Sequence, residues 1–323
     1  MNDTPVVVFS HLRWNSVFQR PHHIMTRLAE RRDVLFVEEP VTNGAITGLE
    51  VTRVAPRIRV VQPHLRVDGP GFGQRQERIL RAQLERLLER EGWDRFVAWL
   101  YTPMAVSLAQ SLNPRAIVYD CMDEPSQFLH APAEIRQRER ELFECADAVF
   151  TGGPSLHEAK RRFHPYAHCF PSSVDLKHFA SATSIPDARE QARLPRPRLG
   201  FFGAIDERMD LDILRHLAAE RPRWSLVLVG PVVEIERSSL PWGANLRYMG
   251  QQPYHDLPGY LAGWDVCLVP FAKNDATRYI SPPKVLEYMA ADRPIVSTTI
   301  TDVVQPYGDI VFLGDGPEGF LEA

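Results

Sequence analysis

The sequence predicts two α/β domains in series, each a Rossmann-like, doubly wound parallel sheet with helices on both faces. Short apolar runs rich in β-branched residues alternate with helical patterns almost throughout the 323 residues, an order typical of such sheets. The alternation is interrupted once, by the polar, proline-rich stretch ASATSIPDAREQARLPRPR at residues 180–198. We therefore expect domains at 1–180 and 199–323, a linker at 181–198, and ligands bound at strand carboxyl ends in a cleft between the domains.

The expected elements of the first domain alternate from its first residues onward. Its strands are short apolar runs: Val6–Ser10, Val34–Val37, Phe96–Leu100, Ala116–Tyr119 and Ala148–Thr151. Its helices show apolar residues at helical spacing: His23–Arg32, Gln74–Glu91, Ile135–Cys145 and Ser155–Arg162, the last opened by a Ser-x-x-Glu capping box. Arginines and glutamates interleave in Gln74–Glu91, which predicts a solvated face, with a helix on a membrane surface as the alternative.

The same alternation restarts in the second domain. Its expected strands are Leu199–Gly203, Ser225–Val229, Leu246–Met249, Val266–Pro270, Ile295–Thr299 and Ile310–Leu313. Its expected helices are Leu211–Glu220, His255–Gly263 and one within ISPPKVLEYMAADRPIV, residues 280–296. Ser281 is expected to cap that last helix, and a proline is tolerated at the first helical position because its missing N–H would be unpaired anyway.

The composition narrows the class of protein. The chain is 44% hydrophobic and 24% charged with a net charge of −4, which is ordinary for a globular protein. Residues 1–180 carry 23 Lys and Arg against 22 Asp and Glu, and residues 181–323 carry 14 against 19, so nucleic acid is not expected as a partner. Four cysteines without metal-type spacing, no signal sequence and no long apolar run predict a cytoplasmic protein, a location that still permits peripheral docking at the inner face of the membrane.

The helix within residues 280–296 is the first candidate site. A helix N-terminus favours an anion, but Pro282 and Pro283 lack an N–H, so positive charge is expected from Lys284. Glu287, three residues on, shares the other face of the helix with Lys284. Alternatively, Lys284 and Glu287 form a surface pair worth roughly 0.2–0.5 kcal/mol and nothing functional. Arg208, in the loop after the strand ending at Gly203, is either a second cation of the site or a solvated loop residue.

Several stretches resemble one family when taken in order. They are HLRWNSVFQRPHHIMTRLAERRDVLFVEEP, CADAVFTGGPSLHEAKRR with PSSVDLKHF, FFGAIDERMDLDIL, SLVLVGPV, NLRYMGQQPYHDLPGYLAGWDVCLVPF and ISPPKVLEYMAADRPIVST. The chain resembles the GT-B glycosyltransferases of the retaining family 4, or group 1, type over nearly its whole length. The resemblance implies two Rossmann-like domains and a nucleotide-sugar donor, with no metal ion and no other cofactor. Asp210 and Asp212 are accordingly expected to stabilise a helix N-terminus rather than to bind a metal.

The resemblance also implies a donor site in the second domain. The family usually has two glutamates eight residues apart; Glu287 matches the second, which contacts the ribose, and Tyr279 stands in place of the first, which contacts the sugar. Tyr279, Asp275 or Asn274 is a candidate substitute for that missing glutamate. The residues expected to bind the donor are Gly203, Arg208, Gly230, Gln251, Tyr279, Ser281, Lys284 and Glu287. Arg208 and Lys284 are expected to stabilise charge on the leaving diphosphate.

Residues after strands of the first domain are expected on the acceptor side. Arg13, Trp14, Asn15 and Asp123 are the acceptor candidates, and Asp120 and His130 the catalytic ones. For Trp14 the alternative is a core position. Asp120 is alternatively a strand-end cap, and His130 alternatively a plain loop histidine.

The predicted activity is that of a hexosyltransferase-type enzyme of polysaccharide biosynthesis. It transfers a sugar from a nucleoside-diphosphate sugar to a hydroxyl of a glycan, polysaccharide or lipid-linked saccharide, with retention of configuration. One alternative is a sugar-nucleotide epimerase of the same fold. The other is a catalytically weak scaffold subunit of a glycan-assembly complex, which the missing first glutamate and the absence of the family's terminal crossover helices after Ala323 favour.

Overall fold

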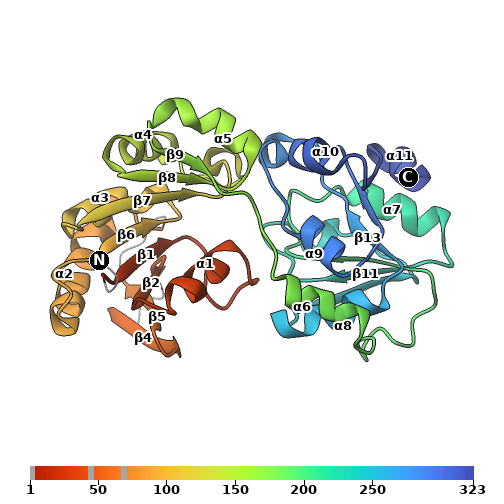
Figure 1. The fold of residues 1–323 in the computed structure, drawn as a ribbon, viewed down its shortest axis with the longest axis horizontal. Coiled ribbons are helices and arrows are strands. Elements are labelled where there is room, and N and C mark those ends of the chain that lie inside the picture. The colour runs from red at the N-terminus through yellow and green to blue at the C-terminus, as the bar shows by residue number, and fades with distance from the viewer. Residues whose placement is uncertain (1–3, 43–46, 67–70) are drawn as a thin grey trace. The chain divides into compact units, whose positions relative to one another are not determined.

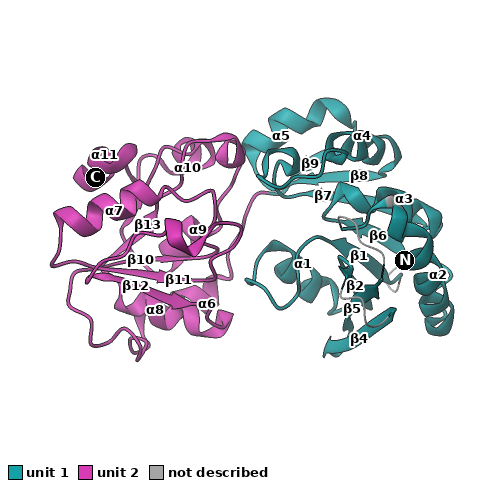
Figure 2. Cartoon of the chain, turned by 180° about the vertical axis from the view of Figure 1, so that it is seen from behind, with its two compact units in different colours: residues 1–170 teal, residues 171–323 magenta. Residues whose placement is uncertain are grey.

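The computed structural model describes residues 4–42, 47–66 and 71–323. The chain divides into two compact units, residues 1–170 and 171–323 (Figure 2). Each unit has its own sheet of mainly parallel strands with helices packed on it (Figure 1). The predicted fold class, two parallel-sheet α/β domains, is therefore confirmed.

The first unit is built on a nine-stranded sheet in the order β3-β5-β2-β1-β6-β7-β8-β9, with β4 paired to β5. The strands are β1 (Val6–Ser10), β2 (Val34–Glu38), β3 (Val41–Thr42), β4 (Gly48–Ala55), β5 (Ile58–Leu65), β6 (Val97–Leu100), β7 (Ala116–Cys121), β8 (Ala148–Thr151) and β9 (Ala167–Cys169). Every residue of β1 is buried. A central parallel strand covered on both faces needs apolar residues on both, which explains the unbroken run VVVFS.

Five α-helices of the described chain accompany this sheet. They are α1 (Arg20–Leu28), α2 (Gln74–Glu91), α3 (Val106–Ser111), α4 (Ile135–Cys145) and α5 (Pro154–Lys160). Met25 of α1 packs in one cluster with Val8 and Phe36 of the sheet. The mixed-charge face of α2 is exposed, and Arg81 and Glu85 form an ion pair there at 2.8 Å, as predicted for a solvated face. Within the described ranges, no helix combines the length and the apolar character needed to cross a bilayer.

The second unit has a six-stranded parallel sheet in the order β12-β11-β10-β13-β14-β15. Its strands are β10 (Arg198–Phe202), β11 (Ser225–Val229), β12 (Leu246–Gly250), β13 (Val266–Val269), β14 (Ile295–Ser297) and β15 (Phe312–Leu313). Its helices are α6 (Leu176–Ala180), α7 (Leu211–Glu220), α8 (Leu257–Gly263), α9 (Lys284–Ala290), α10 (Thr301–Tyr307) and α11 (Gly316–Glu322). Helices α7, α10 and α11 lie on one side of the sheet and α6 and α8 on the other (Figure 1).

The β4–β5 hairpin is the largest element that the sequence pattern does not reveal. Its antiparallel strands pair from Gly48 opposite His64 to Ala55 opposite Ile58. Most residues of β4 are exposed, so the strand carries no apolar run, and Pro63 interrupts the pattern of β5. Because strands are predicted from runs of buried, apolar residues, an exposed edge strand of this kind has the sequence pattern of a loop.

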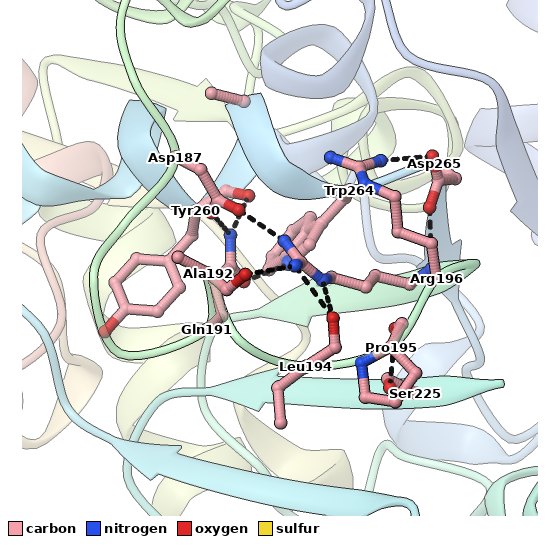
Figure 3. Close-up of polar contacts among 12 residues, drawn as sticks. Asp187, Gln191, Ala192, Leu194, Pro195, Arg196, Ser225, Tyr260, Trp264 and Asp265 are labelled. Atoms are coloured by element: carbon pink, nitrogen blue, oxygen red, sulfur yellow. Dashed lines mark hydrogen bonds and ion pairs between the residues drawn. The ribbon is translucent and has the colours of Figure 1, made fainter. Parts of the chain in front are cut away.

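The division between the units falls after Phe170, ten residues before the predicted domain end at 180. The predicted linker 181–198 packs within the second unit rather than spanning two domains. Figure 3 shows why. Asp187, Ala192 and Leu194, which are labelled there, are all partners of the buried Arg198: its guanidinium pairs with Asp187 and donates to the carbonyls of Ala192 and Leu194. Two of the polar residues that suggested a solvated linker, Asp187 and Arg198, are thus paired with each other, and Arg198 is buried.

A side-chain amide completes the anchoring of this segment. Gln191 donates to the carbonyl of Tyr260 at 2.8 Å and accepts from the indole N–H of Trp264 at 2.9 Å (Figure 3). The indole in turn lies against Gly200 of β10, where a Cβ atom would overlap it. The segment is therefore fixed to the central strand of the second sheet.

Three predicted helix starts are wrong. Helix α9 begins at Lys284 with Pro283 as its N-cap, so Ser281 does not cap it; the carbonyl of Ser281 accepts a hydrogen bond from Ser172 instead. Helix α5 has Gly153 as its N-cap and lacks the predicted capping box at Ser155. Helix α1 begins at Arg20 rather than His23 because the backbone N–H of Gln19 donates to Nδ1 of His22 in a reciprocal cap.

Candidate functional site

The strand order of the second unit creates a topological switch point. The chain starts at the central strand β10 and moves outward through β11 and β12 to one edge. It then returns to the other side of β10 with β13. Open α/β sheets bind ligands where the strand order reverses, so that the connections after two neighbouring strands run in opposite directions. The loops after β10 and β13, with the start of α9, therefore form the candidate site of this unit.

Two glycines bring the backbone close together at this end of the sheet. Gly203 follows β10 with φ +133°, and Gly230 follows β11 with φ +147°, values that L side chains rarely adopt. A Cβ atom at Gly230 would overlap the carbonyl oxygen of Gly203, and the Gly230 N–H donates to the carbonyl of Gly250 at 2.8 Å. The ends of three adjacent strands are thus packed without intervening side chains, and the N–H of Gly203 is also used within the sheet, where it donates to the carbonyl of Val229 at 2.9 Å.

Lys284, the first residue of α9, lies at the same strand end. A Cβ atom at Gly203 would stand 3.4 Å from Lys284 Cε and 3.6 Å from its Nζ. The ammonium lies 5.3 Å from the ring centroid of Phe201 and 4.8 Å from that of Phe271. The structure therefore brings together Gly203 and Lys284, both predicted from the sequence. It adds two phenylalanines that the sequence reading missed because aromatic residues in strand patterns are ordinarily core.

Glu287 lies three residues further along α9, still in its first turn, and is buried. Burial raises the pKa of Glu287 to about 7, and the nearby positive charge of Lys284 opposes this rise. A carboxyl group in this position changes its charge near neutral pH and is suited to accept hydroxyl hydrogen bonds when ionised. The surface-pair alternative for Lys284 and Glu287 does not fit a buried carboxyl group.

This pKa predicts a pH dependence of stability. The folded protein takes up a proton at Glu287 as the pH falls through about 7, whereas the unfolded chain does so only near 4.5. The ionised carboxylate therefore lowers the unfolding free energy above pH 7, and this loss is relieved as the pH falls toward 5. We expect Glu287→Gln to be more stable than the wild type by roughly 2–3 kcal/mol at pH 8 and equally stable near pH 4, below the pKa of the unfolded chain. Urea unfolding of both proteins at the two pH values measures this difference in unfolding free energy. A difference that does not change with pH would contradict the prediction.

Arg208 lies in the loop after β10, but its guanidinium is engaged. Its Nε donates to both carboxylate oxygens of Asp206, at 3.0 and 3.2 Å, and its backbone N–H donates to Asp206 Oδ1 at 3.0 Å. Asp206 is buried. The carbonyl of Arg208 accepts from the N–H of Ala272 at 2.8 Å, which ties this loop to the one after β13. Arg208 is thus held by an aspartate that the motif reading did not single out, and its role toward a ligand stays a prediction.

The other residues predicted to bind the donor lie on nearby loops. Gln251 is exposed and directly follows β12. Tyr279 and Ser281 belong to the segment that leads into α9, where the Arg278 guanidinium lies 5.4 Å from the Tyr279 ring centroid. Asn274, at the start of that segment, caps a short turn through Thr277. The contacts of these side chains with a ligand stay predictions.

In the first unit, Asp120 is fully buried at the end of β7. Its Oδ1 accepts a hydrogen bond from Arg20 Nε at 2.9 Å, and Arg20 Nη1 also donates to the carbonyl of Phe170 at 2.7 Å. Burial raises the pKa of Asp120, and Arg20 opposes that rise. The carboxylate therefore holds Arg20 in place, an interaction that joins residues 100 positions apart and that the sequence did not reveal.

The loop after β1 is held by the buried carboxylate of Glu38. Arg13 Nη1 donates to Glu38 Oε2 at 3.1 Å, and the backbone N–H of Trp14 donates to Glu38 Oε1 at 2.7 Å. The Trp14 ring packs against His22 and Phe36, so the structure favours the core alternative for this residue. Asn15 lines a small cavity of about 100 Å³ together with Glu38 and residues of the β4–β5 hairpin.

The remaining candidates of the first unit lie in the loop after β7. His130 is exposed, which matches a plain loop histidine, and Asp123 is partly buried. The start of this loop is anchored through Glu124, whose carboxylate pairs with the buried Lys160 at 2.8 Å. Across the part of the chain that the structure describes, three or more metal-ligating side chains do not gather in one place. Asp210 caps α7 by accepting from the N–H groups of Asp212 and Ile213, as expected for an acid at a helix start.

The sequence of the second unit matches a known family. Residues 196–323 match the model described as "Glycosyl transferases group 1". A protein of Bacillus subtilis (strain 168) named as the teichuronic acid biosynthesis glycosyltransferase TuaH is 22% identical over 276 residues, which cover 78% of this chain and 70% of that protein.

Solved structures match the fold of nearly the whole chain. A sucrose-phosphate synthase from Thermosynechococcus elongatus superposes with a TM-score of 0.75 at 16% identity, covering 99% of this chain and 88% of that one. HepE of Anabaena, solved with UDP and glucose, gives 0.66 at 15% identity and covers 98% and 88% of the two chains. A trehalose-6-phosphate structure from E. coli with UDP-2-fluoro glucose gives 0.64 at 13% identity and covers 98% and 89%.

Proposed function

We propose that this chain, which belongs to the group 1 glycosyltransferases and has their GT-B fold, transfers a hexose from a nucleoside-diphosphate sugar to a hydroxyl of a saccharide acceptor, with retention of configuration. The observation that carries the proposal is the placement of Lys284 and Glu287 on the first turn of α9, beside Gly203 at the switch point of the second sheet. A cation and a hydroxyl-accepting carboxylate are what a diphosphate and a ribose require.

The roles of the donor residues follow from their chemistry. Lys284 neutralises charge on the diphosphate, and the ionised Glu287 accepts the ribose hydroxyls. Gly203 has no side chain, which leaves room for the phosphates beside Lys284. Arg208, whose guanidinium is oriented by Asp206, is the second cationic residue assigned to the diphosphate.

The proposed transfer needs no covalent nucleophile. The acceptor oxygen bonds to the anomeric carbon from the side that the diphosphate leaves, and the bond between that carbon and the phosphate oxygen breaks. The acceptor proton passes to the departing phosphate. Lys284 and Arg208 stabilise the charge that grows on it, an electrostatic contribution of the kind that dominates many enzymatic rate enhancements. The proposed step uses no metal ion, as the family resemblance implies.

Uracil is the first base to test. Two of the similar solved structures are described with UDP or a UDP-sugar analogue, and the chain shares their fold. A polysaccharide or its lipid-linked precursor is the proposed acceptor, because the similar Bacillus subtilis protein is named for teichuronic acid biosynthesis. We assign acceptor contacts to Arg13, Asn15 and Asp123 of the first unit, and place the protein in the cytoplasm with peripheral contact at the membrane.

The donor site is tested by thermal unfolding with UDP, GDP, ADP and TDP. A nucleotide at about 100 times its dissociation constant should stabilise the protein by about 2.7 kcal/mol. We expect one nucleotide to raise the melting temperature of the wild type and to lose this effect in Glu287→Ala. If none of the four shifts the wild type, the donor site is not functional and the proposal is wrong.

A further inference from the structure

The ammonium of Lys284 lies over two aromatic rings. Its Nζ is 5.3 Å from the ring centroid of Phe201, on β10, and 4.8 Å from that of Phe271, which follows β13. Both distances are within the range in which an aromatic face attracts a cation. The two rings stand edge to face at 85° with their centroids 6.3 Å apart, and both are buried. Buried rings in mutual contact cannot swing away, so they offer the lysine a fixed surface.

Gly203 lies against the Lys284 side chain in addition to the two rings. A side chain there would touch the lysine, since its Cβ atom would lie 3.4 Å from Lys284 Cε. The carbonyl of Gly203 is itself in close contact with Gly230. The lysine side chain therefore runs between two rings and a backbone segment that has no freedom to move. We call Phe201, Phe271 and Gly203 the lysine seat.

A comparison with other lysines explains what the seat provides. The chain has only four lysines: Lys160, Lys177, Lys273 and Lys284. Lys160 lies 2.7 Å from a carboxylate oxygen of Glu139, and Lys273 lies 2.8 Å from one of Asp315. A carboxylate holds each of these two ammonium groups at ion-pair distance. At Lys284, two uncharged rings add their contacts to the field of the nearby Glu287 carboxylate.

We propose that Phe201, Phe271 and Gly203 are positioning residues that hold the Lys284 ammonium ready for the donor diphosphate. The inference rests on the proposed function, since it assumes that a nucleoside diphosphate binds here. A free lysine side chain loses considerable rotational freedom when it is fixed on a ligand. In the seat that freedom is already restricted before binding, so more of the attraction between ammonium and phosphate appears as affinity.

The affinity test compares two phenylalanines that are adjacent on β10. Side chains of consecutive strand residues point to opposite faces; Phe201 contacts Lys284, whereas Phe202 packs on Tyr288 and Trp264. Both are buried, so Phe202→Leu is a matched control for Phe201→Leu. Dissociation constants of full-length protein for UDP and uridine, and for GDP and guanosine, separate the diphosphate contribution from that of the nucleoside.

We expect Phe201→Leu to weaken diphosphate binding roughly fivefold to tenfold and to leave nucleoside binding within about twofold, while Phe202→Leu changes neither. An equal loss in both variants would mean that Phe201 only packs, and would overturn the inference while leaving the proposed function in place. A wild type that binds diphosphates no better than nucleosides would overturn both.

A second measurement examines the seat without any ligand. Selective ¹³C labelling of lysine gives one side-chain signal for each of the four lysines, and Lys284→Arg identifies the one in question. Ring currents of Phe201 and Phe271 should shift the Lys284 Hε signal upfield of that of the exposed Lys177, and Phe271→Leu should reduce the shift. A Lys284 signal at the position of Lys177 in the wild type would show that the seat is not occupied, and would overturn the inference.

Discussion

Lys284→Met is expected to lower the rate of sugar transfer by about 10²- to 10³-fold, the usual effect of removing one group that stabilises developing charge. The leaving diphosphate gains charge as its bond to the sugar breaks, and Lys284 is the cation that lies at the switch-point glycine Gly203. Methionine is similar in length and apolar, and its thioether makes favourable contacts with aromatic rings such as Phe201 and Phe271. The variant should therefore fold normally.

The measurement is steady-state transfer with the donor identified by the nucleotide screen. Lys177→Met is the matched control, since Lys177 is an exposed residue of α6. The same substitution there should leave both kcat and KM unchanged. If Lys284→Met kept more than a tenth of the wild-type kcat at saturating donor, the charge compensation would have to come from another group, with Arg208 the next candidate.

The fold was accessible from the sequence because parallel sheets have a simple signature. Strands β1, β10 and β11 are buried at every residue, so they read as continuous apolar runs separated by helical patterns. This signal depends on burial alone. It fails where burial is one-sided or absent, as in the β4–β5 hairpin, whose exposed first strand contains Glu50, Thr52 and Arg53.

The domain boundary shows a different limit of sequence reasoning. Composition distinguishes polar from apolar segments, but not a solvated polar residue from one that is partnered. Asp187, Gln191 and Arg198 are all polar, yet Gln191 and Arg198 are buried through contacts with groups up to 73 positions away in the chain. A partner at that distance cannot be identified from a local pattern.

The candidate site was predictable only in part, for a similar reason. Lys284 and Glu287 are three residues apart on one helix, so the local sequence reveals both the pair and its place at a helix start. Phe201 lies on β10 and Phe271 follows β13, and they meet Lys284 only because these two strands are neighbours in the sheet. Asp206 is close to Arg208 in sequence, but its bidentate geometry appears only in the structure.

Gly230→Ala is expected to destabilise the second unit by about 3 kcal/mol or more, the sum of a backbone conformation that is nearly restricted to glycine and a steric overlap. The φ of Gly230 is +147°, and a Cβ atom would overlap the carbonyl oxygen of Gly203. Relief requires the ends of β10 and β11 to separate, but the N–H of Gly203 donates to the carbonyl of Val229 at 2.9 Å and resists this movement. The substitution therefore also disturbs Gly203, the residue that contacts Lys284.

Gly250→Ala is the matched control because it separates strain from overlap. Gly250 also has a positive φ, +69°, but no atom lies within 4 Å of the position of an added Cβ. We expect it to cost only about 1 kcal/mol. Calorimetric unfolding of the two variants, with and without the nucleotide that stabilises the wild type, gives both effects. Equal destabilisation by the two alanines would show that the ends of β10 and β11 can separate freely. The close packing of Gly230 against Gly203 would then not be rigid.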